Sequence, residues 1–181
     1  TGAIVSIIGL LDWFIIVDPR LKWCSDTANS RNSYQPSIGK GRQNTATGTA
    51  VGWQPCTSGA IFQAGNYRGG GHADWFLPSQ YEFYQLCRAV WNQTVSNANS
   101  CSGVSGTVRS DFDGGAFWTS TETQNKNAWY VTLNTGTGSS TPKTNVFSVR
   151  PVRAFNKSSV NLTGGTTSSV MKRGEIMTTL R

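Results

Sequence analysis

Residues 74–91 read DWFLPSQYEFYQLCRAVW and carry the strongest structural signal in the chain. Ser79 can accept a hydrogen bond from the amide of Glu82 while the Glu82 carboxylate reaches back to the amide of Ser79. Such a capping box marks the start of a helix. The apolar residues that follow recur at the spacing of one helix face: Phe83, Leu86, Cys87, Val90 and Trp91. We expect a helix over residues 79–93 whose apolar face, with Cys87 on it, packs into the core.

The chain after Cys101 has the composition of a β-sheet. Aromatic and β-branched residues concentrate in residues 116–120, 128–133 and 145–155, partly in alternation, which favours three strands. Residues 135–138 read TGTG, which is a turn signal. The last of these strands contains a proline, so we expect an edge or a bulge there.

The chain before the helix is apolar at first and polar afterwards. Residues 3–17 are apolar but too few to span a bilayer, which takes about 20 residues. We expect two buried strands in them, 3–8 and 13–17. Residues 25–56 form a long polar stretch with little periodicity, and residues 57–66 weakly predict a short helix.

Composition and charge exclude several classes of protein. Only 14% of the residues are charged, while 8 Phe, 7 Trp and 5 Tyr supply an aromatic core. Coiled coil, collagen and a polytopic membrane protein are excluded. The net charge of +7 comes mainly from the chain from Lys143 onward, where basic residues are scattered and form no run. We therefore expect no nucleic-acid partner and no membrane span.

The four cysteines are Cys24, Cys56, Cys87 and Cys101, and no two have C-x-x-C spacing. Because His72 is the only histidine, a zinc site is not expected. An even number of cysteines in a polar, Trp-rich chain indicates two disulfides and an oxidising location. Of the three possible connectivities we favour the sequential one, Cys24–Cys56 and Cys87–Cys101. Four free buried thiols are the alternative.

Five short motifs follow one another along the chain: YRGGG at 67–71, DWFLPS at 74–79, FWTSTE at 117–122, NAWY at 127–130 and VRPVRAF at 149–155. Together with Glu82 and Leu86 they resemble the Lcl C-terminal domain family. That family occurs at the ends of bacterial collagen-like adhesins and in phage structural proteins. The resemblance spans roughly residues 13–155.

The resemblance implies an α+β, C-type-lectin-like fold with two helices, a small twisted antiparallel sheet and long irregular loops. The resemblance covers a domain at 13–155. Composition marks an apolar strand segment at 1–12, available for assembly contacts, and a Ser/Thr/Gly-rich basic linker or start of a further module at 156–181. Calcium-dependent lectins carry Glu-Pro-Asn or Gln-Pro-Asp together with Trp-Asn-Asp, and this sequence carries neither set. We expect no metal and no other cofactor.

Four charged residues fall within these motifs: Asp74, Glu122, Arg150 and Arg153. We expect acid–guanidinium pairs that fix loops to the sheet, because a buried charge needs a partner. Two carboxylates could also serve hydrolysis. No pocket, nucleophile or substrate clamp is evident around them, so we expect no enzymatic activity and no catalytic residue.

We expect a non-enzymatic recognition or adhesion module, extracellular on a bacterial surface appendage or a virion, that binds a glycan or another surface polymer. Its candidate surface is the loop at 123–127 with the facing loop at 135–144. Amides and hydroxyls there can satisfy sugar hydroxyls, while an exposed ring can stack on a sugar face. The candidate ligand-binding residues are Trp118, Gln124, Asn125, Lys126, Asn127, Tyr130, Ser139 and Lys143.

Two alternatives stay open. The rings of Trp118 and Tyr130 could belong to the core, with the polar loops merely solvated. The protein could also be a structural subunit or decoration protein of a virion or fibre that self-assembles through its N-terminal strands and C-terminal tail. Either role suits a homo-oligomer or a larger assembly.

Overall fold

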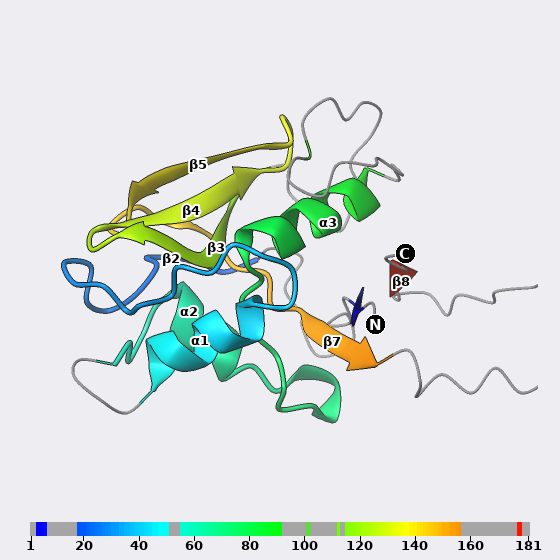
Figure 1. The fold of residues 1–181 in the computed structure, drawn as a ribbon, viewed down its shortest axis with the longest axis horizontal. Helices are drawn as coiled ribbons and strands as arrows, with labels where there is room; N and C mark the ends of the chain where they lie inside the picture. Colours follow the sequence, from blue (N-terminus) through cyan, green and yellow to red (C-terminus); the bar gives the residue numbers. More distant parts are fainter. Residues whose placement is uncertain are drawn as a thin grey trace, which may run out of the picture.

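The structure is a computed structural model that describes residues 3–6, 18–50, 55–91, 101, 112, 115–156 and 177–178. Its helices are α1 (Gly41–Thr49), α2 (Ala60–Gly65) and α3 (Gln80–Val90), with a 3₁₀ turn, η1 (Gly69–Gly71). Its strands are β1 (Ala3–Ser6), β2 (Arg20–Leu21), β3 (Ala116–Gln124), β4 (Asn127–Thr132), β5 (Thr137–Pro142), β6 (Phe147–Ser148), β7 (Arg153–Asn156) and β8 (Met177–Thr178). The chain is therefore α+β, with α1 and α2 lying together and α3 running beside the sheet (Figure 1).

The central sheet has five strands in the order β2-β6-β3-β4-β5. β3 and β4 pair antiparallel, with Phe117 opposite Val131 and Trp118 opposite Tyr130. β3 and β6, in contrast, pair parallel, at Phe117 and Ser148. The expectation of an antiparallel sheet is wrong at this pair. The chain leaves β5 at one edge and crosses past β4 and β3 before β6 enters the sheet alongside β3.

Each face of the central sheet carries its own hydrophobic core. Successive side chains of a strand point to opposite faces. Phe117 belongs to the core that α3 covers, together with Phe83 and Val131. The next residue, Trp118, belongs to the core that α2 covers, together with Ile61. β3 is thus buried on both faces, which explains its nearly continuous run of buried residues.

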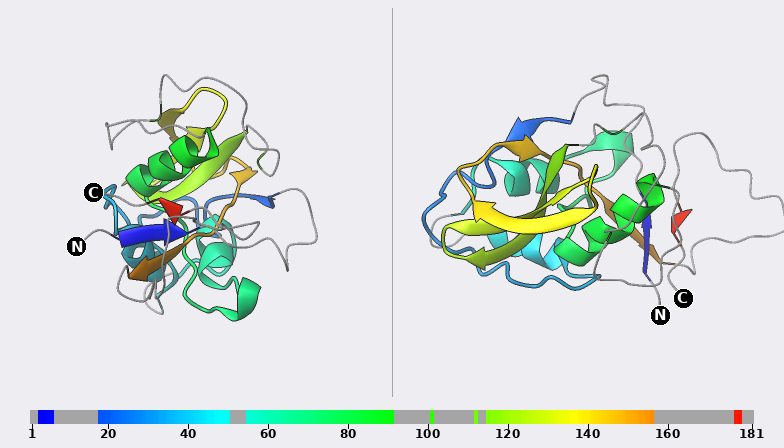
Figure 2. Two further views of the ribbon diagram at one scale, coloured as in Figure 1. Left: turned by 90° about the vertical axis from the view of Figure 1, so that its right-hand side faces the viewer. Right: turned by 90° about the horizontal axis from the view of Figure 1, so that it is seen from above.

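A second, smaller sheet joins both ends of the chain in the order β7-β1-β8. β1 pairs antiparallel with β7, Ile4 opposite Phe155, and with β8, Val5 opposite Thr178. Figure 2 shows these three strands grouped at the end of the molecule near α3. The expected strand at 13–17 lies outside the described residues.

α3 has the start that the sequence predicts. The Ser79 hydroxyl accepts from the amide of Glu82, and the Ser79 amide donates to Glu82 Oε2 over 2.7 Å, which completes the capping box. The stripe residues Phe83 and Val90 are fully buried. Cys87 on the same stripe is bonded to Cys101. The helix ends at Val90, earlier than the expected residue 93.

Helix α1 lies inside the polar stretch 25–56, for which we expected no regular structure. With α2 and α3 it makes three helices among the described residues, so the expectation of two helices is wrong. Its sequence, GRQNTATGT, lacks an apolar stripe. Two polar side chains are buried instead: Asn44 Nδ2 donates to the Gln35 carbonyl over 2.7 Å, and Thr45 Oγ1 accepts from the Leu77 amide over 3.0 Å. A helix whose buried face is polar and hydrogen-bonded has no hydrophobic period to detect.

Strand β5 lies where the sequence indicates a turn at 135–138 and a loop at 135–144. It pairs with β4 along its whole length, from Thr137 opposite Thr132 to Pro142 opposite Asn127. The turn itself lies just before it, at Gly136, which has a φ of 63°. β5 is a sheet edge built from Thr, Gly, Ser and Pro, and its pairing with β4 outweighs its low β propensity.

The two disulfides follow the sequential pairing. Cys24–Cys56 joins the segment after β2 to the segment before α2, and Cys87–Cys101 joins α3 to the segment that follows it. All four cysteines are buried and none is free. Each bridge lies in a different core, Cys24–Cys56 on the α2 side and Cys87–Cys101 on the α3 side.

Candidate functional site

A surface cleft of about 600 Å³ lies between the ring of Tyr34 and the turn that joins β3 to β4. Its lining is aromatic on one side and rich in amides on the other. The lining residues are Tyr34, Thr123, Gln124, Asn125, Lys126 and Asn127. Four of these, Gln124 to Asn127, belong to the predicted ligand-binding set and follow one another in the chain. Tyr34 was not predicted.

Tyr34 supplies the exposed ring that the site needs. The residue is 41% exposed, one of two large hydrophobic residues exposed within the described ranges. Its hydroxyl donates to Ser30 Oγ over 2.5 Å, which fixes the ring against its own loop. The only sequence signal for Tyr34 is that it is an aromatic residue within a long polar stretch. Such a residue could equally belong to the core.

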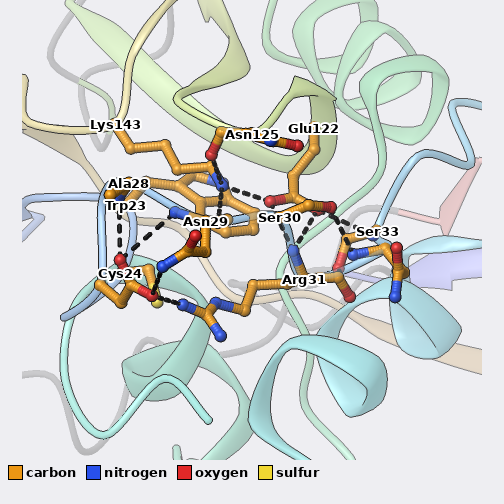
Figure 3. A network of polar contacts seen from close by, with 12 residues as sticks. Trp23, Cys24, Ala28, Asn29, Ser30, Arg31, Ser33, Glu122, Asn125 and Lys143 are labelled. Atoms are coloured by element: carbon orange, nitrogen blue, oxygen red, sulfur yellow. Dashed lines mark hydrogen bonds and ion pairs between the residues drawn. The ribbon is translucent and has the colours of Figure 1, made fainter. Parts of the chain in front are cut away.

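The segment that carries Tyr34 is wrapped around one carboxylate. Glu122, the last buried residue of β3, accepts from the amides of Arg31 and Ser33 over 2.9 Å each and from Ser30 Oγ over 3.3 Å. The Glu122 amide in turn donates to the Ser33 carbonyl over 2.8 Å. Figure 3 shows Arg31 and Ser33 beside the Glu122 carboxylate. Asn32 between them has a φ of 57°, the left-handed conformation that lets the chain turn there.

The opposite wall of the cleft is attached to Lys143. Its Nζ donates to the carbonyl of Asn125 over 2.7 Å and to that of Asn29 over 2.9 Å, and it forms an ion pair with Glu122. Figure 3 shows the lysine reaching across to both carbonyls and the carboxylate. The Lys143 amide also donates to the Lys126 carbonyl over 2.8 Å. Both walls therefore meet at one ion pair.

Four predicted ligand-binding residues do not line the cleft, and two of them are fully buried. Trp118 is fully buried and its Nε1 donates to the Leu21 carbonyl over 2.8 Å. Lys143 is fully buried, and its ammonium group forms an ion pair with Glu122. Their assignment to an exposed ligand surface is wrong. Ser139 is exposed on β5, opposite Tyr130, but is not a lining residue.

Tyr130 is half-buried and also lies away from the cleft. Its ring packs against Phe147, with the ring centroids 4.7 Å apart. Trp118 contacts the same Phe147 ring at 4.7 Å. Trp118, which we expected to stack on a sugar, therefore belongs to the α2-side core. Tyr130, the other expected stacking ring, is partly buried and packs against that core.

Of the four charged motif residues, Asp74 and Arg153 pair with each other, while Arg150 and Glu122 pair with residues outside that set. Arg153 Nε donates to Asp74 over 2.5 Å, and Arg150 Nη2 donates to Asp18 over 2.7 Å. The partner of Glu122 is Lys143, a lysine where a guanidinium was expected. Asp74 receives a second cation, Arg42, over 3.4 Å.

Two charged groups behind the cleft have shifted pKa values. Burial lowers the pKa of Lys143, and the hydrogen bond and charge of Glu122 oppose that shift. Burial raises the pKa of Asp26, but hydrogen bonds from Asn29 and Ala28 and the charge of Arg31 outweigh it and lower that pKa to about 2. Asp26 and Arg31 form an ion pair that closes the loop before Tyr34. Among the six lining residues Lys126 is the one charged side chain.

A family model described as the Lcl C-terminal domain matches residues 17–153. The chain belongs to this family. No curated protein and no solved structure matches it. The matched part of the Lcl C-terminal domain includes every cleft-lining residue and both disulfides.

The short motifs of this sequence make structural contacts in the fold. DWFLPS and VRPVRAF meet through the pair Asp74–Arg153 and through backbone bonds between Phe76 and Val152. FWTSTE forms β3 and ends on Glu122. Across the described ranges no group of three or more His, Cys, Asp or Glu side chains could hold a metal ion. Among those same residues, no helix is long and apolar enough to cross a membrane.

Proposed function

We propose that the cleft beside Tyr34 is the binding site for a glycan or another hydroxyl-rich surface polymer, and that the protein is a non-enzymatic recognition module. The observation that carries the proposal is that the exposed Tyr34 lines one cleft together with three amide-bearing residues, Gln124, Asn125 and Asn127. Each amide offers both donors and an acceptor, which is what paired sugar hydroxyls require. A tyrosine ring offers the flat apolar face on which a sugar ring stacks.

The chemistry of the lining supports binding over catalysis. The six lining residues include no carboxylate, histidine, cysteine or serine. General acid–base hydrolysis of a glycosidic bond uses a pair of carboxylates beside the substrate. Glu122 is the nearest carboxylate along β3, but it is fully buried and occupied by Lys143 and the amides of residues 31 and 33.

We further propose a C-type-lectin-like fold and an extracellular location, on a bacterial cell surface or a virion. A small mixed sheet, two disulfides and a long polar segment between β2 and α1 support the fold assignment. The disulfides also support an oxidising environment. The display context is what the resemblance to this family implies, and membership of the family supports it.

The alternative role, as a self-assembling structural subunit, has less support from the structure. β1 of the apolar N-terminal segment pairs on both sides with strands of its own chain, β7 and β8. Those pairings use the backbone groups that addition of a strand from another copy would need. The binding role is therefore the one that we propose.

A glycan array probed with the wild-type protein and with Tyr34→Ala tests the proposal. Val146→Ala is the matched control, because Val146 is 44% exposed and does not line the cleft. We expect binding of one class of glycan, a loss of about tenfold or more in Tyr34→Ala, and unchanged binding in the control. Equal binding by Tyr34→Ala, or no binding of any glycan by the wild type, would contradict the proposal.

A further inference from the structure

We propose that the buried Glu122–Lys143 pair is a positioning device that sets the shape of the cleft by fixing both of its walls at once. Its effect on ligand affinity rests on the proposed function, whereas the mechanical coupling of the walls does not. The two side chains are 0% exposed, come from β3 and from the segment after β5, and form an ion pair. Neither of them lines the cleft.

The carboxylate fixes the Tyr34 wall. Glu122 accepts the amides of Arg31 and Ser33, so the residue next to Tyr34 is attached directly to the pair. A carboxylate is an acceptor only, and here its two oxygens face backbone amides, a hydroxyl and an ammonium group. A neutral amide in the same place would present an NH₂ group to donors that need an acceptor.

The ammonium group fixes the amide wall. Lys143 Nζ has three N–H donors, and its three acceptors are Glu122, the Asn125 carbonyl and the Asn29 carbonyl. Asn29 precedes the Tyr34 wall, while Asn125 is the tip of the β3–β4 turn. The Trp23 ring lies 4.8 Å from the ammonium group and adds a cation–π contact.

The pair acts as a unit because neither charge is tolerated alone. A buried carboxylate without its cation requires water or a proton, and either one disrupts the amides of residues 31 and 33. Loss of Lys143 should therefore be transmitted to amides that it does not touch. Arginine is no substitute, because a planar guanidinium cannot direct three donors from the position of one nitrogen atom.

The test compares Lys143→Met, Lys143→Arg and Glu122→Gln with Arg150→Met, each studied below its own unfolding temperature. Arg150→Met is the matched control: it breaks the part-buried pair with Asp18, whose residues do not line the cleft. The readouts are amide hydrogen exchange at Arg31 and Ser33 by nuclear magnetic resonance, and affinity for the glycan found on the array. In the wild type, the Lys143 ammonium protons should show nuclear Overhauser contacts to Asn29 and Asn125, a measurement that needs no variant to fold.

We expect all three variants of the pair to exchange the amides of Arg31 and Ser33 at least about tenfold faster and to bind about tenfold more weakly, the scale of a coupling between two sites. The control should lose stability without either change. Unchanged exchange at both amides, the same acceleration in Arg150→Met, or absence of the wild-type ammonium contacts overturns the proposal. If the wild type binds no glycan, the proposed function fails. Amide exchange at Arg31 and Ser33 and the Lys143 ammonium contacts still test whether the pair couples the two walls.

Discussion

Asp74 and Arg153 stand 79 residues apart and form a two-point ion pair, with Nε 2.5 Å from one carboxylate oxygen and Nη2 3.3 Å from the other. Arg153 also lies 5.6 Å from the centre of the Trp75 ring. The pair therefore ties the segment before α3 to the start of β7.

This pair predicts a dependence of stability on pH. The hydrogen bond from Arg153 lowers the pKa of Asp74 below its ordinary 3.8, against the opposing effect of burial. A depressed carboxyl pKa contributes stability above pH 3.8, and that contribution is lost as the pH falls through the folded-state pKa. Asp74→Asn should cost about 1 kcal/mol at neutral pH, because the carboxylate is part-exposed, and the difference from the wild type should vanish in acid. Urea unfolding at several pH values measures this, and a constant difference would contradict it.

The two disulfides should contribute unequally to stability. In the chain-entropy description, a bridge stabilises by restricting the unfolded chain, more for the loop of 32 residues than for the loop of 14. The double variant Cys24→Ala/Cys56→Ala should lose about 0.7 kcal/mol more than Cys87→Ala/Cys101→Ala. Both double variants remove two buried sulfurs, so each controls for the other. Denaturant unfolding that ranks them in the reverse order would show that local packing dominates.

Helix α1 should depend on its buried hydroxyl. Thr45 Oγ1 accepts from the Leu77 amide over 3.0 Å and donates to the Leu77 carbonyl over 3.3 Å. Thr45→Val keeps the shape but leaves two buried backbone groups without partners, at a cost of about 2 kcal/mol. Thr47→Val, at an exposed position of the same helix, is the control for β-branched propensity. A Thr45→Val protein as stable as that control would show that water replaces the hydroxyl.

Trp118 and Tyr34 should behave in opposite ways. Trp118→Phe removes the hydrogen bond to Leu21 and leaves a space beside Phe147, so it should cost about 2 kcal/mol of stability while leaving glycan affinity unchanged. Tyr34→Ala should do the reverse. Thermal unfolding and a binding titration on both variants decide this. A loss of glycan affinity in folded Trp118→Phe would contradict this prediction and would indicate that Trp118 contributes to binding.

Features with a local cause could be predicted from the sequence. The capping box of Ser79 and Glu82 and the apolar stripe through Cys87 depend on neighbours within one helix, and α3 follows both. The amide-rich run Gln124–Asn127 lies at a turn between two strongly patterned strands, and it lines the cleft. In each case the residues that decide the structure lie close together in sequence.

Features that depend on distant partners could not be predicted. Lys143 looked like an exposed loop lysine, because nothing near it in sequence shows that Glu122 and the carbonyls of residues 29 and 125 surround it. Helix α1 buries polar groups whose partners lie up to 76 residues away. Tyr34 directly follows residues 30–33, which turn around the distant Glu122 carboxylate. Long-range polar burial leaves no periodic pattern in the sequence.

The most direct test of the account follows the side-chain amide signals of Gln124, Asn125 and Asn127 by nuclear magnetic resonance while a glycan from the array is added. The account predicts saturable shifts at these three NH₂ groups and at the Tyr34 ring, with small changes at Ser139 on the β5 edge. Saturable shifts that leave these groups unmoved and gather elsewhere, for example along β5 or around Arg42, would contradict the cleft as the binding site.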